Sequence, residues 1–495
     1  MKGCFILQRR FAYIGHNIAV FLKEKYGVND FCGFVLQRPS YNFLKSQTEI
    51  TYSKLLLEED IHKDYKNVKL DINYLRWLEK EYGIPNLWPY LTVDRVVMSN
   101  QLVREYPYDK SPYTHEEMLK ILQVKARAII DFLEKEKPDF IFASVIGSVG
   151  TYLLYHIAKK KNIKVWITLI TAIKNLYTLS EHYAYFTETE KRVLENKFSI
   201  DSIEKAKQFI QDFRNQPAPY YADESPQRQP VFRYQQMRFL LPRNFLKTCL
   251  WIVKYFYHHC RSDERDDYSY SGPFNYLKDG IKRKFRNLLG SYDLCDKFDP
   301  TKDFAFYPLQ YEPEVTSLLQ APFFTNQLHV AKMMARSLPA GYSLYIKDHP
   351  QMARYRPRSF YKQLKKIPNI KLLNPSFTSF QIIPHAKLII TLTGTAGWEA
   401  TILGKPVIVL GNAFYNKLSF VEKCPKIEDL PFTIKKLLEN PKYDENELIH
   451  FVAAIMEESA DVNLQYLWER EKDITKIKKG VEKLADLLAK KLGLI

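Results

Sequence analysis

The chain has 495 residues, a formal net charge of +17 and a hydrophobic content of 46%. This length exceeds one ordinary domain and suits two α/β domains plus an insertion, and the hydrophobic content lets each half bury a sizeable core. The positive charge favours anionic partners, namely nucleic acid, lipid head groups or phosphate-bearing substrates, and by itself does not choose among them.

Cysteine usage and hydropathy indicate the compartment. Six cysteines are scattered without a C-x-x-C pair: Cys4, Cys32, Cys249, Cys260, Cys295 and Cys424. This argues against a zinc site and a disulfide framework, and it fits a reducing cytoplasm. We find no apolar stretch long enough for a signal peptide, and no window approaches the roughly 18 apolar residues of a spanning helix. We therefore expect a cytoplasmic protein, soluble or peripheral at the inner face of the membrane.

The first part of the chain alternates between strand and helix patterns. Strands are predicted at 3–7, 31–36, 139–145 and 164–170, with helical patterns up to 26, at 115–137 and up to 161. Such alternation predicts parallel strands joined by right-handed crossovers. We assign residues 1–215 to an N-terminal Rossmann-like domain.

The character of the sequence changes at about residue 216. Four prolines interrupt any regular element: Pro217, Pro219, Pro226 and Pro230. Between Glu224 and Asp263 the chain has no acidic residue, and it carries the basic residues Arg228, Arg233, Arg238, Arg243, Lys247, Lys254 and Arg261 among many aromatics. We interpret residues 216–296 as a basic, aromatic, helical insertion between two domains. Its aromatics can dock on an anionic membrane surface or pack as an ordinary interdomain helix.

Alternation then resumes over residues 297–495, which we assign to a second Rossmann-like domain with a helical, lysine-rich tail from 444 to 494. Strands are predicted at 304–308, 343–347, 370–373, 388–391 and 407–410, and helices at 325–337, at 358–366 and from 395. The expected fold class is α/β, with two Rossmann-like domains facing a central cleft.

Three motifs stand where strands of the second domain end, which is where open parallel sheets bind ligands. The first, T-L-T-G-T-A-G-W-E-A at 391–400, closes a strand and opens a helix. Helix-start N–H groups, helped by the hydroxyls of Thr393 and Thr395, can bind phosphate. Glu399, one turn further on, can face the same crevice and accept hydrogen bonds from ribose hydroxyls. A tight strand-to-helix turn with a threonine cap explains the motif equally well.

The second motif is Y-I-K-D-H-P at 345–350. Lys347 and His349 lie on one side of an extended strand, because its side-chain period is two, so both can meet one phosphate. The third motif, Y-P-L-Q-Y-E-P-E at 307–314, places Glu312 and Glu314 after a strand, where they can supply a base or bind a sugar hydroxyl. Solvated loop carboxylates are the alternative interpretation.

These three motifs, followed by L-G-K-P-V-I-V-L-G at 403–411, occur in an order that closely resembles the capsule polysaccharide biosynthesis family. That family includes bacterial Kdo transferases, and its H-P element is similar to that of bacterial sialyltransferases. The resemblance covers about residues 300–415. It implies a GT-B architecture, with the nucleotide-sugar donor in the C-terminal domain and the acceptor mostly in the N-terminal one.

The resemblance also implies site residues and substrates. Relatives use CMP-activated acidic sugars such as Kdo or sialic acid, and no cofactor or metal is implied, since fixed donors and a helix dipole neutralise the leaving phosphate. Here the H-P element follows Asp348, where many relatives carry glutamate or a small residue. The donor site is assigned to Gln310, Lys347, His349, Pro350, Thr393, Gly394, Thr395 and Glu399.

The catalytic base is assigned less directly. The N-domain D/E-D/E-G motif of the sialyltransferases is not found, so Glu312, Glu314 and Glu181 are the candidates. Other acceptor-side groups are expected at Arg9, Arg10 and His16, after the first strand, and at His182, beside Glu181.

The expected function is therefore metal-independent transfer of a sugar from a nucleotide donor to a surface-polysaccharide or lipid-linked glycan acceptor. Three alternatives stay open. A teichoic-acid-type glycerophosphotransferase has an H-P element and a second phosphate loop in the same architecture. A nucleotide-sugar epimerase fits the E-A-x-x-x-G-K-P run less well. A nucleic-acid-binding protein would use the basic charge, but no recognition motif accompanies it.

Overall fold

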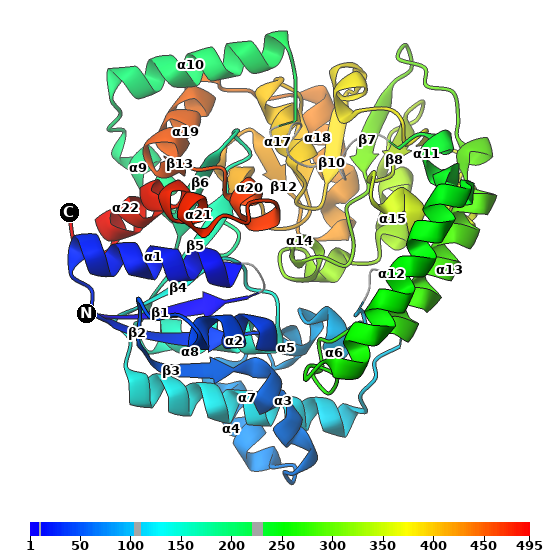
Figure 1. Cartoon of the computed structure of the whole chain (residues 1–495). Helices are drawn as coiled ribbons and strands as arrows, with labels where there is room; N and C mark the ends of the chain where they lie inside the picture. The colour runs from blue at the N-terminus through cyan, green and yellow to red at the C-terminus, as the bar shows by residue number, and fades with distance from the viewer. Residues whose placement is uncertain (9–10, 103–109, 220–230) are drawn as a thin grey trace.

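The computed structural model describes residues 1–8, 11–102, 110–219 and 231–495. These residues form two α/β units, each built on one sheet, with a helical element alongside both (Figure 1). The expected fold class, two Rossmann-like units about a cleft with a helical insertion, is confirmed.

The N-terminal unit contains a seven-stranded sheet in the order β13-β6-β5-β4-β1-β2-β3. Strands β1 to β5 pair in parallel, whereas β6 is antiparallel to both β5 and β13. The strands are β1 (Lys2–Leu7), β2 (Asp30–Val35), β3 (Tyr52–Leu57), β4 (Phe140–Ala143), β5 (Lys164–Ile170), β6 (Leu176–Ser180) and β13 (Ser459–Asp461).

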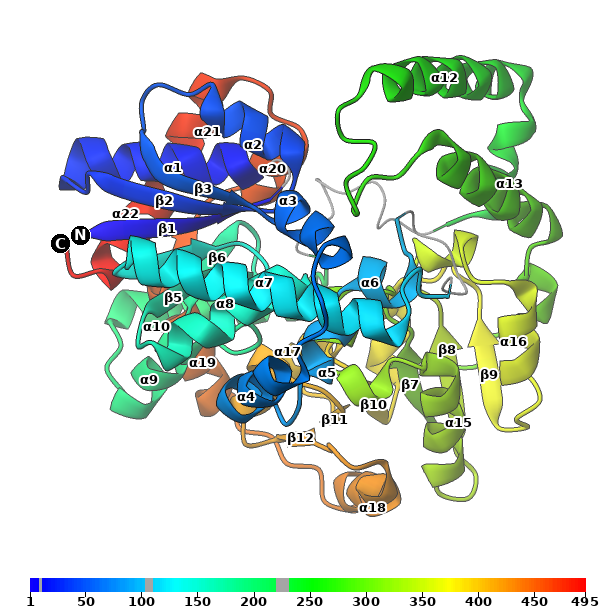
Figure 2. The ribbon, with the colours of Figure 1, turned by 90° about the horizontal axis from the view of Figure 1, so that it is seen from below.

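Helices cover both faces of this sheet (Figure 2). They include α1, whose buried side chains face β1, and α7 and α8, which pack against each other on the opposite face. The helices of this part of the chain are α1 (Phe11–Tyr26), α2 (Arg38–Lys45), α3 (Glu58–Lys63), α4 (Ile72–Tyr82), α5 (Trp88–Thr92), α6 (Arg95–Ser99), α7 (His115–Glu136), α8 (Val149–Lys160), α9 (Thr187–Glu195) and α10 (Ile200–Asn215).

The C-terminal unit contains a six-stranded, all-parallel sheet in the order β12-β11-β10-β7-β8-β9. Its strands are β7 (Phe304–Pro308), β8 (Ser343–Lys347), β9 (Ile370–Leu373), β10 (Leu388–Thr391), β11 (Val407–Val409) and β12 (Val421–Lys423). Its helices are α14 (Val315–Leu318), α15 (Gln327–Ser337), α16 (Arg358–Leu364), α17 (Thr395–Ile402), α18 (Leu430–Glu439) and α19 (Glu445–Glu457). Every strand predicted for this unit is present.

Two segments pack on the other unit from the one expected: helices α9 and α10, and the C-terminal tail. We expected α9 and α10 in the N-terminal unit, but Ala206 and Ile210 of α10 are buried in the same apolar cluster as Leu448 and Phe451 of α19. The tail was expected in the C-terminal unit. Instead β13 extends the first sheet, and the tail helices pack beside α1: α20 (Leu464–Glu469), α21 (Ile474–Gly480) and α22 (Glu482–Lys491). The apolar faces of these helices, rather than chain order, decide where they pack.

The insertion contains α11 (Arg233–Met237), α12 (Pro242–Arg261) and α13 (Pro273–Leu289), and α12 and α13 form a hairpin. The hairpin bridges the two units (Figure 1). At its tip, Asp267 forms ion pairs with Arg38 and Lys63 of the N-terminal unit at 2.8 and 2.9 Å. At its base, Arg286 donates to the backbone oxygen of Tyr355 in the C-terminal unit at 2.6 Å.

No residue of α12 is buried. Some aromatics of this helix pack within the hairpin, as the second interpretation expected: Trp251 and Tyr255 stack on each other and contact Tyr276 of α13. The opposite face of α12 is exposed. Arg228, the first basic residue of the predicted stretch, lies outside the described residues.

Candidate functional site

A cavity of about 710 Å³ lies between the two units and is lined by residues of both. The N-terminal unit contributes residues 144–146 after β4 and 167–170 of β5. The C-terminal unit contributes 308–311 after β7, 347–350 after β8 and 393–396 after β10. The three motifs thus meet at the carboxyl edge of one parallel sheet, as expected for this topology.

Gln310 organises the loop that follows β10. With its amide oxygen turned toward the loop, Gln310 accepts the backbone N–H groups of Thr393 and Gly394, each at 2.7 Å. A Cβ atom at Gly394 would lie 3.0 Å from the Gln310 amide, so a larger residue there would have to displace the Gln310 side chain slightly. Gln310 therefore supports the loop after β10. It also accepts hydrogen bonds from two of the N–H groups that were expected to bind phosphate.

The first turn of α17 retains the phosphate-binding potential. Thr395 and Ala396 line the cavity, and the backbone N–H groups at a helix start have no acceptor within the helix. Tyr415 fixes the turn by donating to the backbone oxygen of Gly394 at 2.6 Å. These N–H groups, the Thr395 hydroxyl and the positive end of the helix dipole can together hold an anion.

Lys347 and Glu399 are buried ionisable side chains in the cavity wall, and each affects the pKa of the other. Burial lowers the pKa of Lys347 to about 8, although the charges of Asp348 and Glu399 act against this shift. Burial likewise raises the pKa of Glu399 to about 8, opposed by Lys347. A lysine with this pKa keeps most of its charge at pH 7 and can neutralise a phosphate.

His349 is held in a defined orientation beside Lys347. Its Nδ1 atom accepts the backbone N–H of Gln351 at 3.2 Å, which in the neutral ring leaves the proton on Nε2. The ring stacks on Tyr311, with centroids 5.3 Å apart. Together with Pro350, His349 lines the cavity, with its ring orientation fixed by these contacts.

Behind the cavity wall, Arg356 holds two motif loops together. It donates to Glu312 at 2.9 Å and to the backbone oxygen of Gln310 at 2.8 Å, and it pairs with Asp348. Its side chain is fully buried, with an exposed fraction of 0%. Burial alone would lower the pKa of Arg356, but the carboxylates of Asp348 and Glu312 raise it overall. The sequence analysis missed Arg356, because nothing in its spacing links it to motifs 8 and 44 residues away.

Glu312 is the first candidate base that the geometry does not support. It does not line the cavity, and its carboxylate accepts from Arg356 and, at 2.5 Å, from Gln327. Asp348, the residue that departs from many relatives, belongs to the same cluster, where it accepts the His349 N–H at 2.7 Å. Both carboxylates accept from protein donors and position the loops; Glu312 does so behind the cavity, whereas Asp348 also forms part of its wall.

Glu314, two residues further on, lines the cavity. It directly precedes α14, and its backbone N–H donates to the Ser317 hydroxyl at 3.3 Å. Arg95 of the N-terminal unit lies near enough for the two side-chain charges to attract each other. Of the three predicted carboxylates, Glu314 is the one that lines the cavity.

The N-terminal candidates that the structure describes do not line the cavity. Glu181 is absent from its lining, and its backbone oxygen accepts from the Tyr155 hydroxyl at 3.1 Å. His182 stacks on Tyr183, and burial lowers its pKa to about 4. His16 is buried in α1, 3.1 Å from the Tyr52 hydroxyl. Arg9 and Arg10 lie outside the described residues.

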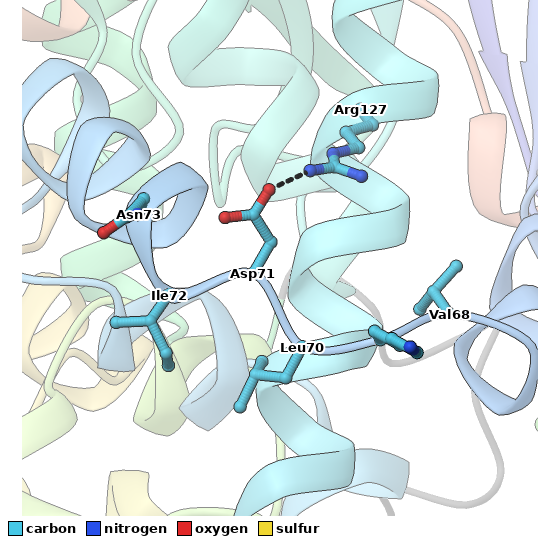
Figure 3. Close-up of a pocket in the computed structure, with 7 residues that line it drawn as sticks. Val68, Leu70, Asp71, Ile72, Asn73 and Arg127 are labelled. Atoms are coloured by element: carbon cyan, nitrogen blue, oxygen red, sulfur yellow. Dashed lines mark hydrogen bonds and ion pairs between the residues drawn. The ribbon is translucent and has the colours of Figure 1, made fainter.

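A separate hollow lies on the N-terminal unit, around residues 68–73 (Figure 3). Asp71 pairs with Arg127 at 2.6 Å and caps α4 by accepting the Tyr74 N–H at 2.9 Å. Asp71 and Arg127 therefore serve the local fold, and Lys69 and Asn73 are the other polar residues of the hollow.

The described part of the chain has neither a cluster of metal ligands nor a helix that could span a membrane. No group of three or more His, Cys, Asp or Glu side chains there is arranged to hold a metal ion. None of the helices in that part is long and apolar enough to cross a membrane.

Comparison with solved structures gives weak, broad similarity. The beta Kdo 2,7 transferase of Thermosulfurimonas dismutans KpsC is 14% identical, with 68% of this chain and 83% of that chain covered and a TM-score of 0.36. The beta Kdo 2,4 transferase of the same protein is also 14% identical, covering 66% and 83%, with a TM-score of 0.38. A UDP-GlcNAc 2-epimerase from Neisseria meningitidis bound to UDP-GlcNAc is 12% identical, covering 99% and 100%, with a TM-score of 0.23.

Comparison of sequences is more specific. Protein FixF of Sinorhizobium fredii (strain NBRC 101917 / NGR234) is 29% identical over 125 residues, which are 24% of this chain and 30% of that protein. The chain therefore aligns with less than a third of this relative's length. Residues 207–420, which include all four motifs, match the family described as "Capsule polysaccharide biosynthesis protein". Over this segment, the resemblance to the capsule polysaccharide biosynthesis family that the order of the motifs indicated is confirmed.

Proposed function

We propose that this protein is a glycosyltransferase that moves a sugar from a nucleotide donor to a surface-polysaccharide acceptor. The observation that carries this proposal is the convergence of the three motif loops on one interdomain cavity, in a segment that matches the capsule polysaccharide family. The donors we propose are CMP-activated acidic sugars such as Kdo or sialic acid, and the acceptor is a glycan or lipid-linked glycan.

In this proposal the C-terminal unit holds the leaving nucleotide. Lys347, His349 Nε2–H and the first turn of α17 stabilise the charge that develops on the donor phosphate, and preorganised groups of this kind do so without reorganising. Glu399 accepts ribose hydroxyls. Glu314 acts as the general base that removes a proton from the acceptor hydroxyl.

Thermal shift against CMP, CDP, UDP and GDP tests the donor class, because a ligand that binds only the folded state raises the melting temperature. We expect the largest shift with CMP. A shift with CDP-glycerol and none with any nucleotide sugar would instead favour the teichoic-acid-type glycerophosphotransferase.

His349→Ala and Thr395→Ala are each expected to weaken nucleotide binding about ten- to a hundredfold, since each removes a hydrogen bond to a charged group worth about 1.5–3 kcal/mol. Isothermal titration with the nucleotide from the panel measures this loss. His385→Ala, an exposed histidine of the same unit, is the control and should bind normally. Unchanged affinity in both folded variants would refute the site assignment.

Donor binding is expected to be independent of divalent metal. The positive groups in the cavity wall are a lysine, a histidine N–H and a helix start, which supply the neutralising charge from the protein itself. Titration of the nucleotide with and without EDTA checks this. Binding that EDTA abolishes and magnesium restores would show that the proposed mechanism is incomplete.

We further propose that the protein docks on an anionic membrane surface through α12. Its outer face carries Leu246, Leu250, Val253 and Tyr257, at helical spacing and with exposed fractions of 58–68%. The helix has no acidic residue and exposes Arg243, Lys247, Lys254 and Arg261. An apolar stripe with flanking basic side chains is typical of helices that lie in the interface of anionic membranes.

Liposome flotation tests this docking. Wild-type protein is expected to float with phosphatidylglycerol vesicles at low salt and to lose binding as salt rises, because each basic group contributes about 1 kcal/mol of electrostatic attraction. Leu250→Glu should abolish flotation, whereas Leu194→Glu, at an exposed leucine of α9, should not. Absence of binding at low salt would leave α12 with a bridging role alone.

A further inference from the structure

A second cavity, of about 650 Å³, lies between the helical hairpin and the two units. Arg95 and Leu102 come from the N-terminal unit, Tyr355 comes from the C-terminal unit, and α12 and α13 supply the rest of the wall. Its volume falls within the roughly 300–1,000 Å³ range of small-ligand sites. None of its lining residues belongs to the interdomain cavity that holds the proposed nucleotide-sugar donor, called the donor cavity below.

The wall of this second cavity carries excess positive charge. It contains four cations, Arg95, Lys247, Arg283 and Lys284, and one acid, Asp279. Arg283 is already engaged, because it lies 3.8 Å from Asp279 and donates to the Tyr355 hydroxyl at 3.0 Å. The other three cations form no ion pair with another described residue.

Arg95 is the most unusual of these cations. Burial lowers its pKa, despite the attraction of Asp94 and Glu314, and no hydrogen bond joins its guanidinium to another described residue. The neighbouring carboxylate of Asp94 accepts the backbone N–H groups of Val96, Val97 and Val149. A half-buried charge that has no hydrogen-bond partner among the described residues is stabilised when a ligand supplies the counter-charge. Guanidinium groups bind carboxylates and phosphates through two parallel hydrogen bonds.

Aromatic rings stand beside these cations. Trp251 stacks on Tyr255 at 5.2 Å and meets the edge of Tyr276 at 5.6 Å, and both Trp251 and Tyr276 line the cavity. Tyr355 closes the side toward the C-terminal unit. Aromatic rings offer an apolar face together with a polar tip. Such faces, combined with cations that form no ion pair in the described part of the chain, suit a sugar ring that carries an acid group better than they suit a bare inorganic anion.

The second cavity adjoins the proposed reaction centre. Arg95 lines it, and the charge of Arg95 interacts with Glu314, which lines the donor cavity. We propose that the second cavity binds an acidic saccharide, the carboxylate- or phosphate-bearing part of the acceptor, through Arg95, Lys247 and Lys284 with Trp251 and Tyr276 as stacking walls. This inference rests on the proposed glycosyltransferase function, since it treats the ligand as an acceptor.

Tryptophan fluorescence tests the proposal without turnover. Tetragalacturonate and trehalose 6-phosphate carry the two acid groups, and maltotetraose is the neutral control. We expect at least one acidic sugar to quench the fluorescence saturably, maltotetraose to have no effect, and Trp251→Phe to remove the signal. Arg95→Gln and Lys247→Gln should each weaken the acidic sugar at least about tenfold, the effect of losing a hydrogen bond between charged groups. Lys254→Gln removes a charge of the same helix outside the cavity and should bind like wild type.

The same variants separate this proposal from the donor site. Arg95→Gln and Lys247→Gln are expected to keep the wild-type nucleotide affinity. If wild-type protein binds an acidic sugar but no nucleotide, the donor-site assignment alone is refuted. Lys247 is exposed, so its variant remains informative if Arg95→Gln does not fold. Acidic sugars that bind wild type and both variants equally, or that do not bind at all, overturn the proposal. So does binding restricted to phosphatidylglycerol vesicles and lost in both variants, which would make the cavity a lipid head-group site.

Discussion

Arg356→Met is expected to destabilise the protein by about 3–5 kcal/mol, the range for removing one partner of a buried ion pair. In the native protein one guanidinium satisfies Glu312, Asp348 and the backbone oxygen of Gln310. Without it, two carboxylates remain buried, each with an exposed side-chain fraction of 2%. Urea unfolding followed by circular dichroism measures the loss.

The control lies two residues away. Arg358 pairs with Asp293 at the surface, so Arg358→Met should change stability by no more than about 1 kcal/mol. A second comparison tests the cause of the loss. The triple variant Arg356→Met, Glu312→Gln, Asp348→Asn removes the buried charges and should recover part of the stability. Equal stability losses for Arg356→Met and Arg358→Met would contradict the importance of the buried cluster.

Arg356→Met should also weaken nucleotide binding in the protein that remains folded. The guanidinium joins the loop of Gln310, which holds Thr393 and Gly394, to the loop that carries Lys347 and His349. Loss of this tie lets two donor loops move independently, and small displacements of positioning groups are costly for ligand binding.

The second unit could be predicted closely from its sequence because its signals are local. Its strands are short apolar runs, and each ends in the polar or glycine-containing motif that its loop needs. The convergence of Lys347, His349 and Thr395 on one cavity followed from the rule that parallel strands present their carboxyl ends at one edge.

The parts that could not be predicted depend on contacts between distant residues. Arg356 is an unremarkable arginine in the sequence, and only the fold shows that it separates Glu312 from the cavity and leaves Glu314 in it. The tail helices have the same amphipathic pattern whichever unit they cover, so the sequence could not predict that they pack beside α1. Arg95 was not predicted as a site residue, because an isolated arginine is usually exposed to solvent.

Glu314→Gln is expected to lower kcat about 10²- to 10⁴-fold, the usual contribution of a general base, with little effect on nucleotide affinity. Glutamine keeps the shape of the side chain and removes its ability to take a proton. Transfer rates are measured with the sugar of the nucleotide that gives the largest thermal shift. If Glu314 is the base, the acidic limb of the kcat/KM profile should also disappear in the variant, because that limb reports the base of the free enzyme.

Glu312→Gln is the matched comparison, since the two carboxylates were equivalent candidates in the sequence and differ only in their surroundings. Glu312 is bonded to Arg356 and Gln327, so its variant should lose stability while the folded protein keeps a turnover close to wild type. A stability loss confined to Glu312→Gln and a rate loss confined to Glu314→Gln would separate the two roles. If Glu314→Gln turns over normally, the base must come from the N-terminal side of the cavity, where Ser144, Thr168 and Tyr183 are the residues of the lining with a hydroxyl group.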